Sequence, residues 1–236
     1  MRKAHLLLNL GVIAATSRST RRFYDRISPF YESIFTDHLP HIVTLLDALD
    51  QIFPTKDHVA VLDIACGTGA LSRRLAEGGF CVTGIDFSLR SLCRLNQAEK
   101  TIRLVQSDAG CLPLRSCCFD AVTCMGAWRH FHEPELVVSE IRRVLRPTGV
   151  FVVGYFPPKL GGIVPAPSGA AGRAVAFSYA SLMRVLNYED RVDQRMGSQT
   201  LEMITRAFKR HRAIPSGKSS YLILGELPRQ DAISRC

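Results

Sequence analysis

The chain contains 236 residues, of which 47% are hydrophobic, so it carries enough apolar side chain for the core of one α/β domain with a terminal extension. Its formal net charge of +9 is concentrated at the ends, because residues 1–22 sum to +5, residues 202–236 to +4 and the stretch between them to zero. A neutral body with basic ends is compatible with an anionic partner, but solvated basic ends are the more common case.

The eight cysteines do not indicate a disulfide scaffold. Five of them, Cys66, Cys81, Cys93, Cys111 and Cys124, lie inside or beside hydrophobic runs, where a reduced cysteine acts as a small apolar residue. No CxxC pair or Cys/His spacing predicts a zinc site. The adjacent Cys117 and Cys118 could bind a soft metal or form a strained redox pair, but we favour an ordinary turn before a strand. A reducing cytoplasm is the simplest setting for this cysteine usage.

Residues 1–19 begin with basic side chains and continue with a short apolar run, a pattern that imitates a signal peptide. Asn9 interrupts the run, which is too short to span a bilayer. We therefore expect a helical extension rather than a cleaved signal. The expected localisation is cytoplasmic, with an apolar, basic N-terminus that can contact a membrane surface.

From residue 19 to residue 53 the apolar spacing predicts helices, which are broken at Pro29 and Pro40. Strands and helices then alternate. Strands are expected at 59–65, 81–87, 102–108, 119–127 and 149–156, and helices at 70–79, 88–100 and 133–147.

Residues 157–175 are rich in Pro, Gly and Ala and predict a long loop or lid. A helical stretch around 178–208 follows, and then two strands at 208–214 and 219–227 that form an antiparallel pair. The pattern predicts an α/β fold with a doubly wound, mainly parallel seven-stranded sheet, helices on both faces and an antiparallel last strand. We expect a helical cap over 1–54 and a main domain over 55–236, with 157–190 as a lid or substrate insertion.

Residues 59–69, "VAVLDIACGTG", form a strand followed by a glycine turn. Gly67 and Gly69 let the backbone approach a ligand closely, and the helix from Ala70 points its positive end there. A dinucleotide-binding loop needs a third glycine where this chain has Ser72, and a P-loop needs a Gly-Lys-Ser/Thr ending that is absent from the sequence. The turn alone is therefore compatible with several ligands.

Three aspartates follow three successive strands. Asp63 would repel a pyrophosphate but attract a cationic ligand, Asp86 can accept hydrogen bonds from both hydroxyls of a ribose, and Asp108 can accept from the exocyclic amine of an adenine. Each aspartate alone could instead cap a helix or lie in a surface turn. Together they describe a site for a phosphate-free, positively charged adenosine derivative, and S-adenosylmethionine (SAM) fits that description.

The segments "VLDIACGTGALSRRLAEGG", "VTGIDFS", "SDAGCLPL", "FDAVTC" and "EIRRVLRPTGVFVV" resemble the successive motifs of class I SAM-dependent methyltransferases, which have a Rossmann-like fold. The resemblance is strongest to the broad group of quinone-biosynthesis and other small-molecule methyltransferases (type 11). It covers about 59–155, and more weakly 22–35, where "FYDRISPFYESIF" is similar to the leading segment of the group.

The resemblance implies that SAM is the cofactor and assigns residues to it. Asp63, Ala65, Gly67 and Gly69 would hold the methionine side, Asp86 the ribose, and Asp108 and Ala109 the adenine. Phe87 is a further cofactor-binding residue, and Met125 would line the site. Tyr31 would lie over the cofactor or acceptor. The chain departs from the group at Arg129 and His130, where a His-His pair is frequent. It also departs before the fifth strand, where the usual Pro-Gly-Gly is replaced by Pro147, Thr148 and Gly149.

A general base is needed only if the methyl acceptor must lose a proton. The candidates are His130, His132 and Tyr31, and we place His130 first because it follows the fourth strand. A structural role for His130 is at least as common. Trp128 could stack on a planar acceptor or pack under the following helix. No metal site is expected.

The acceptor is the least specified part of the prediction. The Asn/Asp-Pro-Pro-aromatic motif of enzymes that methylate exocyclic base nitrogens is replaced here by "CMGAW", and "YFPPK" follows the wrong strand. We therefore expect a small organic acceptor, with O- or C-methylation of a phenolic or quinone-type ring ahead of N-methylation. The alternatives are a non-catalytic protein that binds SAM for regulation or assembly and, behind it, an RNA methyltransferase. The oligomeric state is not predicted.

Overall fold

The computed structural model describes residues 13, 19–34, 39–155, 198–208, 210–216 and 221–227. Its centre is a seven-stranded sheet with the strand order β3-β2-β1-β4-β5-β7-β6. The strands are β1 (Ala60–Ile64), β2 (Cys81–Asp86), β3 (Arg103–Gln106), β4 (Phe119–Met125), β5 (Leu145–Tyr155), β6 (Arg210–Pro215) and β7 (Tyr221–Glu226). The first five are parallel, and β7 is antiparallel to both β5 and β6. This confirms the fold predicted from the sequence.

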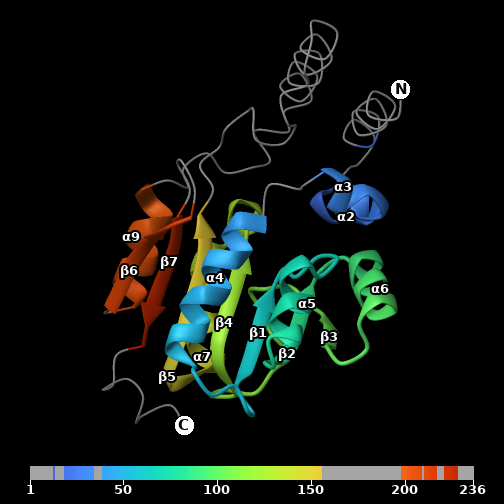
Figure 1. The fold of residues 1–236 in the computed structure, drawn as a ribbon. Helices are drawn as coiled ribbons and strands as arrows, with labels where there is room; N and C mark the ends of the chain where they lie inside the picture. Colours follow the sequence, from blue (N-terminus) through green and yellow to red (C-terminus); the bar gives the residue numbers. More distant parts are fainter. Residues whose placement is uncertain are drawn as a thin grey trace, which may run out of the picture.

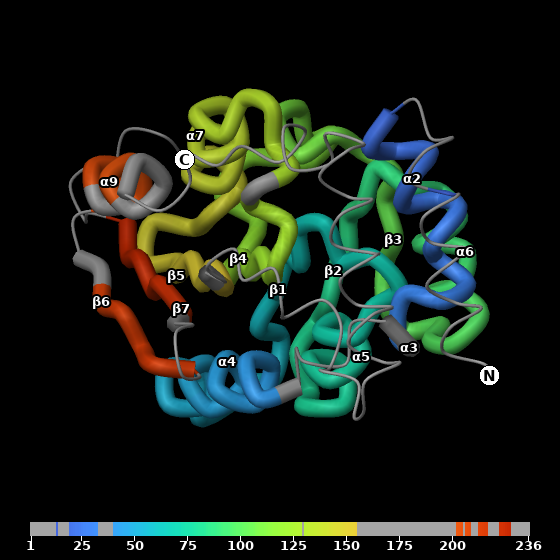
Figure 2. Tube along the Cα trace, turned by 90° about the horizontal axis from the view of Figure 1, so that it is seen from above, coloured from blue at the N-terminus to red at the C-terminus, as the bar shows by residue number. Residues whose placement is uncertain are grey.

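Helices cover both faces of the sheet (Figures 1 and 2). On one face lie α4 (Leu39–Ile52), α5 (Ala70–Glu77) and α6 (Leu89–Ala98), which contribute Leu45, Leu75 and Leu95 to one core cluster. On the other face lie α7 (Pro134–Val144) and α9 (Ser198–Ala207), whose Ile141 and Ile204 belong to a second cluster. Because both faces are covered, the central strands are apolar nearly throughout, as is typical of parallel sheets.

Local signals explain where these helices begin and end. The hydroxyl of Ser88 accepts a hydrogen bond from the backbone N–H of Ser91 and caps α6, and Gly78 ends α5. Helix α7 ends at Val144 rather than near Pro147, because Leu145 already has extended backbone angles and pairs with Phe119 in the sheet. The residue preceding a proline avoids helical angles, so the chain leaves the helix before Pro147.

The segment before α4 lies at the carboxyl edge of the sheet. It consists of α2 (Thr20–Ile27), a 3-10 turn η1 (Ser28–Phe30) and α3 (Tyr31–Ile34), and Pro29 marks the change from helix to 3-10 turn. We call residues 19–34 the cap. The cap is held by the buried side chains of Phe23 and Ile27, and its polar contacts to the main domain include a 2.6 Å hydrogen bond from Ser88 Oγ to Asp25 Oδ1.

Helix α4 belongs to the layer on the sheet rather than to the cap, since Ile42, Leu45 and Leu49 share a core cluster with β1 and β7. The division at residues 54 and 55 stays a prediction, and the predicted lid at 157–190 lies outside the described residues.

In the described part of the chain, no helix is long and apolar enough to cross a membrane, and no cluster of His, Cys, Asp or Glu is arranged to hold a metal ion. The thiol of Cys118 is free, so Cys117 and Cys118 are not joined to each other.

Candidate functional site

A cavity of about 440 Å³ lies between the cap and the carboxyl ends of the parallel strands, a volume typical of small-molecule sites. Parallel α/β sheets bind their ligands at this edge. Its walls come from the cap, from the loops that follow β1 to β4 and from the start of α7. Predicted site residues in these walls are Tyr31, Ala65, Gly67, Asp86, Phe87, Asp108, Ala109, Met125, His130 and His132. Asp63 and Gly69 are not among the lining residues.

The two glycines of the loop after β1 have different roles. Both have left-handed backbone angles, with φ of 57° at Gly67 and 88° at Gly69. A Cβ atom added to Gly67 would meet no atom within 4 Å, so this glycine keeps part of the cavity open. A Cβ atom on Gly69 would lie 2.2 Å from Cδ1 of the buried Leu95, so Gly69 allows the loop to pack on α6. Ala65 also has a positive φ of 56°, a strained angle of the kind that clusters at functional sites.

Asp63 lies beneath this loop, with only 2% of its surface exposed. Ser72 Oγ donates to Oδ2 at 2.5 Å and Thr123 Oγ1 donates to Oδ1 at 2.9 Å. Burial raises the pKa of Asp63 to about 6, against the lowering effect of the two hydroxyl groups. This placement does not support the expected direct contact between Asp63 and a cationic ligand. The carboxylate instead ties the start of α5 to β4 under the loop.

Asp86 ends β2 and lies in the cavity wall, although it is largely buried. Its two carboxylate oxygens accept hydrogen bonds from the backbone N–H groups of Gly67 (2.9 Å) and Ser88 (2.8 Å). Burial raises the pKa of Asp86, and the two backbone donors oppose that rise. A carboxylate oxygen accepts more than one hydrogen bond, so both oxygens can also receive hydroxyl groups of a bound ligand.

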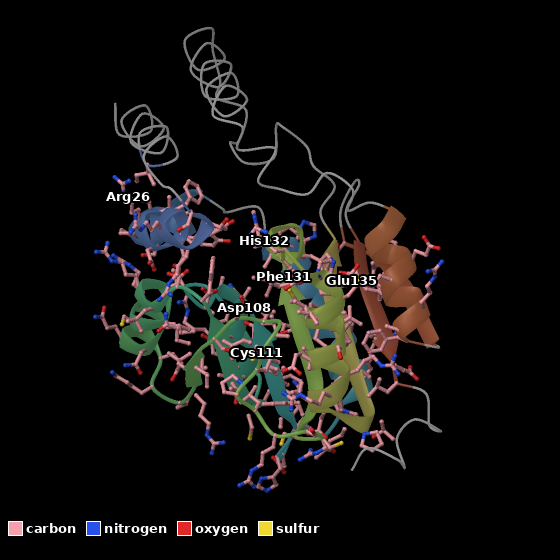
Figure 3. The ribbon with its side chains drawn as sticks, turned by 180° about the vertical axis from the view of Figure 1, so that it is seen from behind. Arg26, Asp108, Cys111, Phe131, His132 and Glu135 are labelled. Atoms are coloured by element: carbon pink, nitrogen blue, oxygen red, sulfur yellow. The ribbon has the colours of Figure 1, made fainter. Side chains whose placement is uncertain are left out.

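Asp108 and Ala109 follow β3 on the side of the cavity below α2, where Figure 3 labels Asp108 and Cys111. The backbone N–H of Gly110 donates to Asp108 Oδ1 at 2.8 Å, which fixes the carboxylate over the turn. Figure 3 also shows Phe131 and His132 beside the upper end of β4. Residues of both loops line the same cavity.

His130 lies in the short 3-10 turn η3 (Trp128–His130) that follows β4. Its Nε2 atom is 2.8 Å from the hydroxyl oxygen of Tyr24 in α2, so a hydrogen bond joins the cap to the β4 loop. The ring of Tyr24 also lies near Phe87 and Tyr31, with centroid distances of 6.0 and 6.3 Å. These aromatic side chains form the wall of the cavity nearest the cap.

Trp128 does not line the cavity. It is buried and packs against Phe131 and Phe151, with ring centroids 5.4 and 5.9 Å away. Of the two roles open for Trp128 in the sequence, packing under the following helix is therefore the one the structure shows.

Sequence reasoning missed Tyr24. The available signal was the similarity of residues 22–35 to the leading segment of the resembled group, in which an aromatic residue followed by Asp precedes a Tyr-acid pair. That aromatic residue is Tyr24, and its neighbour Asp25 bonds Ser88. Of the two tyrosines, only the later Tyr31 is expected at the site from the sequence.

The charges of the cavity fit a cationic, phosphate-free adenosine derivative. Among the described lining residues, Asp86, Asp108 and Glu133 are acidic and Arg21 is the one Lys or Arg side chain. The space above Gly67 admits a ligand where a side chain would fill it. These two observations agree with the predicted SAM site, in which carboxylates receive hydroxyl and amino groups.

Comparison with known proteins shows that the chain is similar to methyltransferases. Residues 62–153 match the family model described as "Methyltransferase domain". A demethylmenaquinone methyltransferase of Renibacterium salmoninarum is 38% identical over 96 residues, which cover 41% of this chain and 40% of that protein. A ubiquinone biosynthesis O-methyltransferase of Xanthomonas oryzae pv. oryzae is 36% identical over 94 residues, covering 38% and 39% of the two chains. The chain thus spans about two fifths of the length of these curated relatives.

The magnesium protoporphyrin IX methyltransferase of Synechocystis PCC 6803, solved with bound SAH, superposes on this chain with a TM-score of 0.59. The two share 16% sequence identity, and the superposition covers 84% of this chain and 87% of that one, so it supports the fold alone. The matched residues contain β2 to β4 and most of β1 and β5, with the glycine loop and the three aspartates. Residues 62–153 therefore match a methyltransferase domain in sequence, and the fold agrees with that match.

Proposed function

We propose that this protein transfers the methyl group of SAM to a small organic acceptor, and that the acceptor is a phenolic or quinone-type ring methylated at oxygen or carbon. The observation that carries the proposal is the single cavity that joins the motif loops to the aromatic side of the cap. Cofactor and acceptor can thus meet in one cavity.

Some of the proposed cofactor residues would touch the cofactor, and others would shape the loop that touches it. Gly67, Asp86, Asp108 and Ala109 line the cavity and would contact the cofactor, with Ala65, Phe87 and Met125 completing the wall. Asp63 and Gly69 would act indirectly, because they shape the loop from below. When bound, SAM supplies the methyl group as an already activated sulfonium, so the protein's main task is to align the acceptor.

The proposed acceptor class rests on the aromatic wall. The rings of Tyr24, Tyr31, Phe87 and Phe131 all line the cavity, and aromatic side chains stack well with planar rings. The names of the two relatives, which refer to demethylmenaquinone and ubiquinone biosynthesis, point to the same chemical class. The nucleic-acid alternative has no comparable support among the described residues.

The test of this function is a screen for labelled methyl transfer. The protein would be incubated with SAM carrying a radioactive methyl group and with a set of aromatic hydroxyl compounds, including catechol and menadiol, the reduced form of 2-methyl-1,4-naphthoquinone. Calorimetry with SAM and S-adenosylhomocysteine would measure binding separately. Binding with transfer to an aromatic acceptor supports the proposal, whereas binding without transfer to these compounds or to a metabolite extract favours the non-catalytic alternative.

We also propose a cytoplasmic location with peripheral membrane contact through the basic N-terminus, which would suit a hydrophobic acceptor. Sedimentation with vesicles of anionic phospholipid should carry down the full chain and leave a variant lacking residues 1–18 in solution. Equal sedimentation of both proteins would remove the membrane proposal and leave the methyltransferase proposal unchanged.

A further inference from the structure

We propose that Tyr24 is a catalytic residue, and that it passes the proton of the acceptor hydroxyl to Nε2 of His130. This inference rests on the proposed function and names the groups that receive the proton. Its basis is the 2.8 Å hydrogen bond between the Tyr24 hydroxyl and His130 Nε2, two residues separated by 106 positions in the chain.

The pair lies where an acceptor must bind. Tyr24 and His130 both line the cavity that Gly67 and Asp86 also line, so the pair lies in the walls of the same cavity as the proposed cofactor contacts. The two rings meet edge to face, with centroids 5.4 Å apart and planes at 76°. Tyr24 enters from the cap and His130 from the β4 loop, so the hydrogen bond is made only when the cap lies over the cavity.

The chemistry follows from what each atom can donate and accept. A phenol hydroxyl donates one hydrogen bond and accepts two, so Tyr24 can donate to His130 Nε2 while it accepts from an acceptor hydroxyl. Nε2 is occupied by Tyr24, so an acceptor proton reaches His130 through the Tyr24 oxygen. This arrangement requires the His130 tautomer with its proton on Nδ1.

The proposed step is balanced in atoms and charge. The O–H bond of the acceptor breaks and its proton joins the Tyr24 oxygen, while the original Tyr24 proton forms a new N–H bond at His130 Nε2. The electron pair left on the acceptor oxygen would form the bond to the methyl carbon that SAM supplies, and the methyl–sulfur bond would break with its electron pair left on the sulfur. His130 becomes an imidazolium ion, and its positive charge replaces the charge that the sulfonium loses, so the total charge is unchanged.

The test compares Tyr24→Phe and His130→Asn with the wild-type protein. Tyr24→Phe keeps the ring that packs near Phe87 and removes only the hydroxyl. The control is His58→Asn, because His58 is an exposed residue before β1, at the opposite edge of the sheet, and its positive φ suits asparagine. Affinity for S-adenosylhomocysteine, measured by calorimetry, should stay within about threefold in all three variants.

The kinetic readout is kcat for labelled methyl transfer to the aromatic hydroxyl compound that the wild-type protein methylates. Loss of a proton acceptor in the transition state costs about 10²- to 10⁴-fold, so both site variants should lose about that factor in kcat. The double variant should lose no more than the more damaging single change, because the two residues act as a unit. A Tyr24→Phe protein that keeps kcat within threefold of wild type overturns the inference and leaves the proposed function standing.

A second readout does not require turnover. The nitrogen-15 NMR chemical shifts of the His130 ring, assigned by comparison with His130→Asn, should show an unprotonated Nε2 and a protonated Nδ1 in the wild-type protein. In Tyr24→Phe the chemical shift of Nε2 should change. Tyr31→Phe, which removes another hydroxyl of the cavity wall, should leave these shifts unchanged. A proton found on Nε2 in the wild-type protein would overturn the relay, and a wild-type protein that methylates none of the acceptors would refute the proposed function together with it.

Discussion

Gly67→Ala and Gly69→Ala form a matched pair that separates binding from folding in the glycine loop. Both positions have left-handed backbone angles, so the backbone conformation of an alanine at either one costs about 1–2 kcal/mol. The surroundings differ, because the new Cβ meets nothing within 4 Å at Gly67 but lies 2.2 Å from Leu95 Cδ1 at Gly69. Leu95 is fully buried in a core cluster, so its side chain cannot move aside without disturbing its neighbours.

The expected magnitudes follow from that difference. Gly67→Ala should lower the free energy of unfolding by about 1–2 kcal/mol, which is the backbone cost alone. Gly69→Ala adds overpacking of about 1–3 kcal/mol and should lower it by about 2–5 kcal/mol in total. For binding the order reverses, since the Gly67 methyl group enters the cavity and should weaken S-adenosylhomocysteine binding about tenfold or more, which is at least about 1.4 kcal/mol.

The assay combines urea unfolding, followed by the fluorescence of the buried Trp128, with calorimetry of S-adenosylhomocysteine binding. Shortening Leu95 to alanine should recover part of the Gly69→Ala loss in a double-mutant cycle, because it removes the clashing atoms. Equal destabilisation by the two glycine variants, or unchanged binding by Gly67→Ala, would refute the assignment of one glycine to the ligand and the other to packing.

Three further predictions concern the polar residues beneath and beside the cavity. Burial raises the pKa of Asp63 from 3.8 to about 6, so the folded state holds this proton more tightly than the unfolded state. The free energy of unfolding of the wild-type protein should therefore fall by up to about 3 kcal/mol from this group as the pH rises from about 4 to about 6, and Asp63→Asn should remove that fall. Urea unfolding at both pH values measures this, and an unchanged pH dependence would contradict it. Asp86→Asn should weaken S-adenosylhomocysteine binding by about 1–3 kcal/mol in calorimetry, while the exposed Asp57→Asn binds as wild type; equal affinities would count against the ribose contact. Ser88→Ala should lower the free energy of unfolding by about 1–2 kcal/mol in the same urea assay, since it removes both the α6 cap and the bond to Asp25, and a value near zero would show that neither contact stabilises the fold.

The strands, their order along the chain and the edge that holds the site could be predicted from the sequence. Apolar runs such as the one before Asp63 end in polar residues and glycines, which is the pattern of a buried parallel strand. The antiparallel pair β6 and β7 was predicted from two such runs joined by a short turn. The end of α7 was placed about three residues too far along, because a helical periodicity does not reveal that Leu145 pairs with β4.

The division of roles within the site could not be predicted, because it depends on partners far along the chain. Asp63 and Asp86 follow the same pattern in the sequence, yet Asp63 is covered by Ser72 and by Thr123, which is 60 residues away. Tyr24 has the spacing of an ordinary packing residue in an amphipathic helix. Its part in the cavity becomes visible only when the fold brings His130 beside it.

Ser88 has a consequence for ligand binding. Its backbone N–H is bonded to Asp86, the proposed ribose contact, and its hydroxyl is bonded to Asp25 of the cap. Opening the cap and emptying the cofactor site therefore act on the same residue, and linkage makes their effects on each other reciprocal. A bound cofactor should favour the closed cap, and a closed cap should strengthen the binding of S-adenosylhomocysteine by the same factor.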